Sequence, residues 1–244
     1  MLAAALLLAA MLPTAADAQQ LTVAAASSLS DAFKEIAPAF EAATPGATLR
    51  FNFAASGVLL QQISQGAPVD LIVSADEETV RRGIERRLLD ADSRRDVASN
   101  SVVLIVPTAS TLKGLADLAG PGVRRIAIGK PATVPVGRYS QQALEAAGLW
   151  NALAPRLVPA DSARQVLDYV ARGEVDAGFV YRTDAALMAQ RVHLVLTLQG
   201  HAPVRYPLAL VSEGKHKALA RAFADYLQGT QARAILARHG FVVP

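Results

Sequence analysis

Short apolar segments alternate with longer amphipathic segments along the chain from Leu21 onward. The first amphipathic segment spaces Leu29, Phe33 and Ile36 three or four residues apart, which is the spacing of one buried helix face. Short apolar runs between such helices are typical of the strands of an α/β protein. The pattern therefore predicts an α/β fold, and the 244 residues are enough for one large domain or two lobes.

Eight segments have the length and apolar content of strands. They are residues 21–25, 48–53, 70–74, 101–106, 125–128, 177–180, 193–196 and 208–211. A glycine follows four of the helical patterns, as expected of left-handed helix C-caps, at Gly66, Gly148, Gly173 and Gly240. Extended runs at residues 100–106 and 206–211 are compatible with a chain that crosses twice between two lobes.

Four helix starts directly follow a strand or a loop. They are Ser28, Ser56, the pair Pro135 and Val136, and the pair Asp161 and Ser162. Ordinary helix capping is the plainest reading of each serine. In an α/β sheet, however, such turns gather at the carboxyl edge of the strands, where their unpaired N–H groups can hold an anion. The sequence thus offers an anion cradle that needs no charged side chain.

The first residues predict a secretory signal peptide. The apolar run 1–11 is shorter than the ~20 residues of a membrane span, and Ala16 and Ala18 fit a cleavage site before Gln19. No Lys or Arg precedes the run, which is unusual for such a signal, and a buried N-terminal helix is the alternative. We therefore expect residues 1–18 to be removed and the protein to be exported to the periplasm. The chain has no cysteine, so neither disulfides nor a lipid anchor on a thiol are expected.

Several other kinds of chemistry lack their sequence signals. The formal charge of +3 comes from scattered basic residues, which argues against nucleic-acid binding. The four histidines match no zinc spacing, and Pro131 stands where a P-loop needs Ser or Thr. The segment around Ser56 reads A-A-S-G without the first glycine of a nucleophile elbow. We expect no catalytic residues, no metal-cation site and no cofactor.

Longer stretches resemble the periplasmic molybdate-binding proteins. The stretch T-V-A-A-A-S-S-L-S-D-A-F at residues 22–33 is similar to their opening strand and helix, and F-N-F-A-A-S-G at 51–57 with G-A-P-V-D-L-I-V-S-A-D at 66–76 to their second segment. Four further stretches follow in family order, so the likeness covers nearly all of the chain after residue 18. They are V-P-V-G-R-Y, P-A-D-S-A-R-Q-V-L, G-F-V-Y-R-T-D-A and Y-P-L-A-L-V. Gly129-Lys130-Pro131 departs from the common G-D-P, which puts a base near the third helix start.

The resemblance implies a type II periplasmic-binding-protein fold. Each of its two lobes would be a mixed sheet flanked by helices, with the ligand in the cleft between them. Lobe 1 would hold residues 19–100 and 206–244, and lobe 2 residues 101–205. The oxyanion would be bound by the hydroxyls of Ser28, Ser56 and Tyr181 and by backbone N–H groups at Ser28, Ser56, Val136 and Ala163.

The expected ligand is molybdate or tungstate, which a monomer would deliver to an ABC-type permease of the inner membrane. A pocket made only of donors favours fully deprotonated anions, because hydrogen phosphate brings a proton that needs an acceptor. Sulfate is also deprotonated, so a receptor for sulfate or another tetrahedral oxyanion is an alternative. An enzyme on the same fold, using Ser56 or Asp161, is a weaker one, since no His or Lys is placed as its base.

Overall fold

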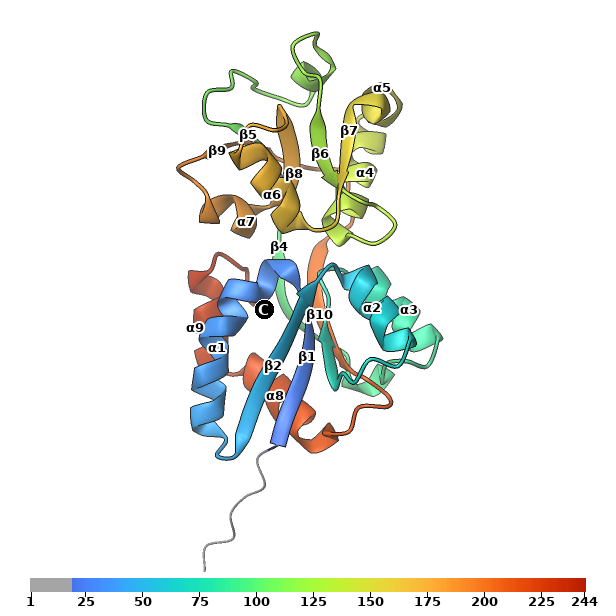
Figure 1. The fold of residues 1–244 in the computed structure, drawn as a ribbon, viewed down its shortest axis with the longest axis vertical. Coiled ribbons are helices and arrows are strands. Elements are labelled where there is room, and N and C mark those ends of the chain that lie inside the picture. The colour runs from blue at the N-terminus through green and yellow to red at the C-terminus, as the bar shows by residue number, and fades with distance from the viewer. Residues whose placement is uncertain (1–18) are drawn as a thin grey trace, which may run out of the picture.

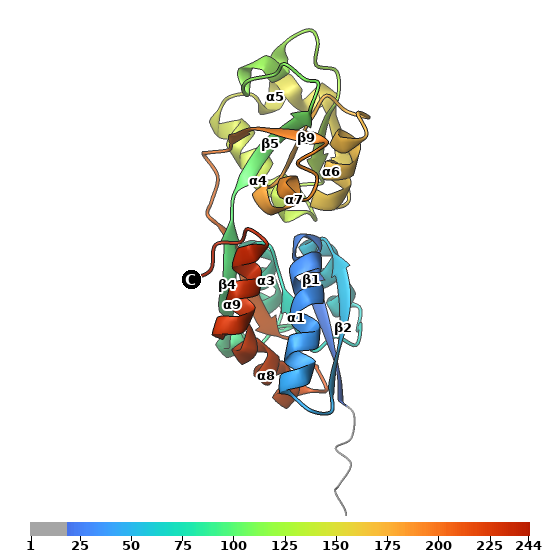
Figure 2. The ribbon, with the colours of Figure 1, turned by 90° about the vertical axis from the view of Figure 1, so that its left-hand side faces the viewer.

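The computed structural model describes residues 19–244, and these form two α/β lobes stacked end to end (Figures 1 and 2). The predicted signal peptide, residues 1–18, lies outside the described residues. Within residues 19–244, no helix is both long enough and apolar enough to cross a bilayer.

The first lobe contains a five-stranded mixed sheet in the order β2-β1-β3-β10-β4. The first three of these strands run parallel, and β10 is antiparallel to both β3 and β4. The strands are β1 (Gln19–Ala26), β2 (Ala47–Ala54), β3 (Leu71–Val73), β4 (Arg95–Asn100) and β10 (Val204–Leu210).

The second lobe repeats this arrangement with the order β7-β6-β8-β5-β9. Three parallel strands are again followed by a reversed one, β5. The strands are β5 (Val102–Pro107), β6 (Ile126–Gly129), β7 (Leu157–Ala160), β8 (Ala177–Tyr181) and β9 (Val192–Thr197). The predicted two-lobed fold with a mixed sheet in each lobe is confirmed.

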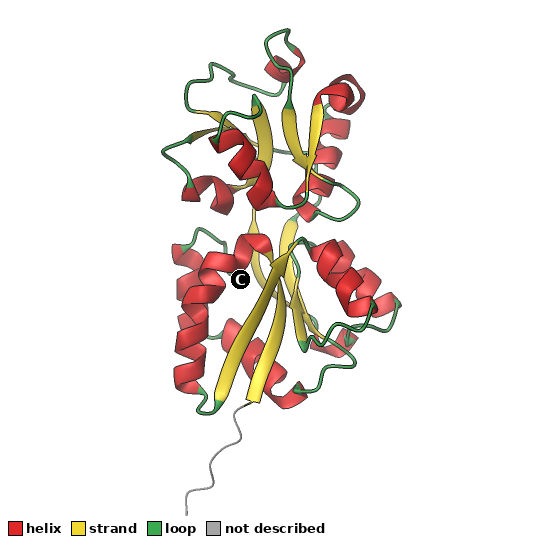
Figure 3. Cartoon of the chain, in the orientation of Figure 1, coloured by secondary structure: helices red, strands yellow, loops and turns green. Residues whose placement is uncertain are grey.

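Helices cover both sheets (Figure 3). They are α1 (Ser30–Ala43), α2 (Ser56–Ser64), α3 (Glu77–Glu85), α4 (Pro135–Ala146), α5 (Trp150–Leu153), α6 (Ala163–Ala171), α7 (Arg182–Leu187), α8 (Lys217–Gln228) and α9 (Thr230–Arg238). The predicted buried face of α1 is confirmed, and its Phe33 and Phe40 pack edge-on against Phe223 of α8, with ring centroids 6.1 and 5.0 Å apart. The four glycines predicted as helix caps all have a positive φ.

The sequence pattern does not predict two of the strands, β4 and β7. Both lie at the edge of their sheet, where a strand is less covered than in the centre. β4 reads R-D-V-A-S-N and β7 contains Pro159, a residue that edge strands tolerate. The strand predicted at 208–211 also begins earlier, at Val204, and pairs with β4 there.

The chain passes between the sheets at two places. β4 ends at Asn100 and β5 begins at Val102, and β9 and β10 are joined by residues 198–203. The carboxyl ends of β1 and β2 point toward those of β6 and β7 where the two lobes meet (Figure 1). Ligands bind at this edge of α/β sheets.

Candidate functional site

A small cavity lies where the two lobes meet. It is lined by Ala26, Ser27, Ser28, Ala54, Ala55, Ser56, Ala75, Val134, Pro135, Val136, Ala163 and Tyr181. All five residues predicted to hold an anion are among them, and each is at most 6% exposed. None of the lining side chains carries a charge. The structure thus brings together donors that are far apart in the sequence.

Helix N-termini converge on this cavity from both lobes. Ser56 is the first residue of α2, Val136 is the second residue of α4 after Pro135, and Ala163 is the first residue of α6. The first N–H groups of a helix have no partner within it, and each helix N-terminus carries about half a positive charge. The cavity wall is therefore electropositive although no cation lines it.

Neither serine caps a helix with its side chain, so the helix-capping alternative is wrong for both, although Ser56 starts α2 as predicted. Ser28 lies in a 3₁₀ turn (Ser27–Leu29) before α1, and its hydroxyl is 3.0 Å from the Tyr206 hydroxyl. The Ser56 hydroxyl oxygen accepts a hydrogen bond from the Ala75 N–H at 3.0 Å. In contrast, Pro135 at the start of α4 and Ser162 as the cap of α6 are confirmed. Tertiary partners, rather than the local helix, contact both serine hydroxyl oxygens.

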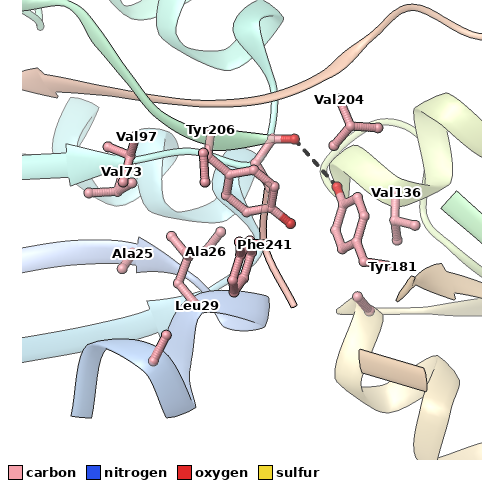
Figure 4. Close-up of a cluster of buried hydrophobic side chains, with 14 of the residues drawn as sticks. Ala25, Ala26, Leu29, Val73, Val97, Val136, Tyr181, Val204, Tyr206 and Phe241 are labelled. Atoms are coloured by element: carbon pink, nitrogen blue, oxygen red, sulfur yellow. Dashed lines mark hydrogen bonds between the residues drawn. The ribbon is translucent and has the colours of Figure 1, made fainter. Parts of the chain in front are cut away.

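Tyr181 ends β8 and reaches across to the first lobe. Its hydroxyl donates to the Ala75 carbonyl at 3.4 Å (dashed line in Figure 4). Burial raises the pKa of Tyr181 well above its ordinary value of 10. The hydroxyl therefore keeps its proton at neutral pH, and it would have to turn that proton away from Ala75 to donate it to a ligand.

Further polar contacts join the lobes around the cavity. The Gly57 N–H of α2 donates to the Thr133 carbonyl at 3.0 Å. Arg138 of α4 pairs with Asp76, whose side chain is only 4% exposed. On the opposite lobe edge, Arg164 of α6 donates to Asp31 of α1 at 3.0 Å. The lobes are thus in direct contact, with the cavity between them.

Lys130, the base that departs from the family pattern, is outside the cavity lining. Its ammonium group forms an ion pair with Asp161 at the solvent surface. Such an exposed pair stabilises little, but it gives the lysine a partner other than the cavity.

Asp184 is a buried carboxylate behind Arg164. Its Oδ1 lies 3.3 Å from the Arg164 Nε, without the geometry of a hydrogen bond. Burial raises its pKa from an ordinary 3.8 to about 6, and the nearby Arg164 charge only partly opposes this.

This raised pKa predicts a pH-dependent stability that Asp184→Asn removes. Between pH 3.8 and about 6 the folded state holds a proton on Asp184 that the unfolded state has lost. The stability contributed by this group is therefore present at low pH and falls as pH rises through that window, by roughly 3 kcal/mol. We expect urea unfolding at pH 4 and pH 7 to show Asp184→Asn gaining stability relative to wild type at the higher pH. The exposed Asp225→Asn is the control, and an equal gain there would contradict the assignment.

Sequence reasoning missed the residues that support the site, among them Asp76, Arg138, Arg164, Asn100 and Tyr206. Each interacts with a partner at least 62 residues away, so no local spacing marks it. Tyr206 begins the stretch Y-P-L-A-L-V that resembles the family, but nothing in that stretch gives its hydroxyl a role.

Within the described range, no group of three His, Asp or Glu side chains could hold a metal ion.

These features define a class of protein: two lobes that enclose a small solute in a cavity between helix N-termini. Residues 21–242 match the family described as bacterial extracellular solute-binding protein. The chain belongs to this family.

Named relatives lie close in sequence and structure. The molybdate-binding protein ModA of Escherichia coli is 37% identical over 238 residues, covering 93% of this chain and 91% of its own. The periplasmic molybdate-binding protein of Azotobacter vinelandii superposes with a TM-score of 0.78 at 28% identity, over 92% of this chain and 99% of its own. The sulfate-binding protein SubI of Mycobacterium tuberculosis, at 20% identity and a TM-score of 0.81, covers 91% and 86% and shows a shared fold alone.

Proposed function

We propose that this protein captures molybdate, or tungstate, in the cavity between its lobes and delivers it to the permease of an ABC importer. The single observation that carries the proposal is a buried cavity with donors from both lobes and no charged side chain in its wall. A dianion in it would be stabilised by helix N-termini and neutral hydroxyls. The relatives named as molybdate-binding proteins support the choice of anion.

The proposed ligand donors are the hydroxyls of Ser28, Ser56 and Tyr181 and the N–H groups of Ser28, Ser56, Val136 and Ala163. Because donors on both lobes would contact one anion, binding favours the state in which the lobes are together. The permease would recognise that state. The protein would catalyse no reaction and need no cofactor or metal cation.

The remaining features of the proposal follow from the family and the sequence. The protein would work in the periplasm as a monomer without a lipid anchor, after removal of residues 1–18. Its lobes would comprise residues 19–100 with 206–244, and residues 101–205.

Calorimetric titration of the purified protein tests the proposal. We expect molybdate and tungstate to bind tightly at neutral pH, and hydrogen phosphate to bind weakly or not at all. Tight binding of sulfate with no response to molybdate would replace the proposed ligand by the sulfate alternative. Absence of binding to all four anions would reject the oxyanion function, and turnover of a substrate at Ser56 or Asp161 would favour the enzyme alternative.

Ser28→Ala and Ser56→Ala test the cavity itself. Each removes one hydroxyl donor to a charged ligand, and we expect molybdate affinity to fall about 10-fold, or ~1.4 kcal/mol. Ser64→Ala is the matched control, because the Ser64 hydroxyl is exposed and donates only to the Gln61 carbonyl. Unchanged affinity in both cavity variants would place the anion elsewhere.

A further inference from the structure

Behind Ser28 lies a tyrosine that does not line the cavity. The Tyr206 ring is fully buried, packs edge-on against Phe241 with centroids 5.3 Å apart, and lies beside Tyr181 at 5.8 Å (Figure 4). Its hydroxyl is 3.0 Å from the Ser28 hydroxyl oxygen, and either group could donate. Which of the two donates decides whether Ser28 can give its own proton to an anion.

Asn100 resolves the direction of this hydrogen bond. Its Oδ1 accepts from the Ser101 N–H at 2.8 Å, which identifies Nδ2 as the other atom of the amide. Nδ2 donates to the Thr183 hydroxyl at 2.9 Å and to the Tyr206 hydroxyl at 3.3 Å. The Tyr206 oxygen therefore already accepts a proton from Asn100.

The proton of Tyr206 itself then needs an acceptor, because an unpaired buried hydroxyl is costly. Burial raises the pKa of Tyr206, so this proton stays in place. Among residues 19–244, the Ser28 oxygen is the one acceptor that contacts it. Tyr206 consequently donates to Ser28, and the hydrogen bonds run from Asn100 through Tyr206 to Ser28.

A serine hydroxyl that accepts in this way has its hydrogen left to donate. Ser56 is oriented by the same principle, since its oxygen accepts from the Ala75 N–H at 3.0 Å. Both serines line the cavity, so each has a proton available for a ligand and an oxygen already engaged by the protein. The serine hydroxyls are donors because of the residues behind them.

We propose that Asn100 and Tyr206 are specificity-determining positioning residues, which act through Ser28 by making its hydroxyl a donor to the bound oxyanion. The inference rests on the proposed function. It predicts that fully deprotonated oxyanions gain more from this arrangement than hydrogen phosphate does, because Ser28 presents its hydrogen to the anion, whereas the proton of hydrogen phosphate needs an acceptor. Thr183 belongs to the second lobe and Tyr206 to the first lobe's sheet, so Asn100 orients Ser28 while touching both lobes.

Tyr206→Phe removes the phenol oxygen and keeps the ring in its aromatic cluster. We expect molybdate to bind about 5-fold more weakly, or ~1 kcal/mol, because Ser28 loses the donor that orients and polarises it. Hydrogen phosphate should lose less affinity than molybdate, or gain. Tyr226→Phe is the matched control, since the Tyr226 hydroxyl in α8 is buried with no hydrogen-bond partner among the described residues.

A double-mutant cycle with Ser28→Ala distinguishes positioning from a general structural role. If Tyr206 acts through Ser28, the double variant binds molybdate within about 2-fold of Ser28→Ala alone, because the effects of coupled residues do not add. Multiplied losses, or a Tyr206→Phe protein that binds like wild type, would overturn the proposal.

Asn100→Asp is a second variant for the case in which Tyr206→Phe does not fold. Its carboxylate accepts from Tyr206 and no longer donates to it, so the Tyr206 oxygen can accept from Ser28 and competes with the anion for the Ser28 proton. We expect a larger loss than in Tyr206→Phe, and one that shrinks in the Ser28→Ala background. An equal loss in both backgrounds would contradict the proposal.

Failure of the proposed function would be seen separately. If wild-type protein binds sulfate and not molybdate, the choice of ligand is wrong, and the same cycle run with sulfate tests the role of Tyr206.

The side-chain amide signal of Asn100 in an NMR spectrum can be measured without any ligand. This signal should shift in Tyr206→Phe and stay unchanged in Tyr226→Phe. An unmoved signal in Tyr206→Phe would refute the chain of hydrogen bonds.

Discussion

Replacing Gly57 by alanine is expected to weaken molybdate binding by more than 100-fold, or ~2.7 kcal/mol, while both lobes remain folded. A Cβ at this position would lie 2.6 Å from the Thr133 carbonyl oxygen and 2.9 Å from its Cα. Both atoms belong to the backbone of the opposite lobe, which has no side-chain freedom with which to yield. The methyl group would thus hold α2 away from the loop before α4 and break the 3.0 Å bond from the Gly57 N–H to Thr133.

The loss should come from incomplete closure of the lobes rather than from unfolding. Small-angle scattering with and without molybdate should show compaction in wild type and little in Gly57→Ala, and the affinity comes from calorimetry. Gly114→Ala is the matched control, because a Cβ there meets nothing within 4 Å. Wild-type affinity in Gly57→Ala would mean that ligand binding does not require the lobe contact seen here.

The second large effect is expected at Arg138. Its guanidinium pairs with the buried Asp76 across the lobes, donates to the Thr79 hydroxyl at 3.1 Å, and holds the Pro131 carbonyl at 3.0 Å. Arg138→Met would leave Asp76 buried without its partner whenever the lobes meet, a situation that costs about 3–5 kcal/mol. When the lobes part, water can solvate Asp76, so most of that cost falls on closure. We expect molybdate affinity to fall about 100-fold.

The companion variants make this prediction specific. Adding Asp76→Asn to Arg138→Met should restore part of the affinity, because removing both partners of a buried pair costs far less than removing one. Arg81→Met is the control, since Arg81 forms ion pairs only at the exposed surface of α3. Calorimetric measurement of molybdate affinity in wild type, Arg138→Met, the double variant and Arg81→Met checks this prediction. A double variant that binds no better than Arg138→Met would show that Arg138 acts by organising its own loop.

The inter-lobe ion pairs flank the cavity and leave it uncharged. Arg138 is engaged by Asp76, and Arg164 by Asp31 and the buried Asp184. Each guanidinium thus has a carboxylate partner within the protein. The cavity itself is left to neutral donors and helix N-termini.

Much of the local structure can be read from the sequence because its causes are local. The buried face of α1 follows from the spacing of Phe33, Ile36 and Phe40. The helix that ends at Gly66 is predictable because glycine readily adopts the left-handed backbone conformation found there. Central strands are predictable because they are buried on both faces and read as apolar runs. The strands β4 and β7 escape prediction because β4 is mostly polar and β7 is four residues long and contains Pro159.

The family resemblance indicates five cavity residues, and the structure places all five around one cavity. The resemblance could not identify the hydrogen-bond partners of the serine and tyrosine hydroxyls. Sequence alone favours helix capping for Ser28 and Ser56, yet Ser28 contacts a tyrosine 178 residues away and Ser56 accepts from an N–H 19 residues away.

What the sequence by itself determined is thus the set of elements and the helix starts that point donors at an anion. What only the tertiary structure decided is which way those donors face and what holds the lobes together around them. The reason is physical: periodicity and helix ends depend on neighbours in the chain, whereas hydrogen-bond direction and buried ion pairs depend on neighbours in space. Asn100, Tyr206 and Arg138 act through the second kind, and they are the residues that the sequence did not single out.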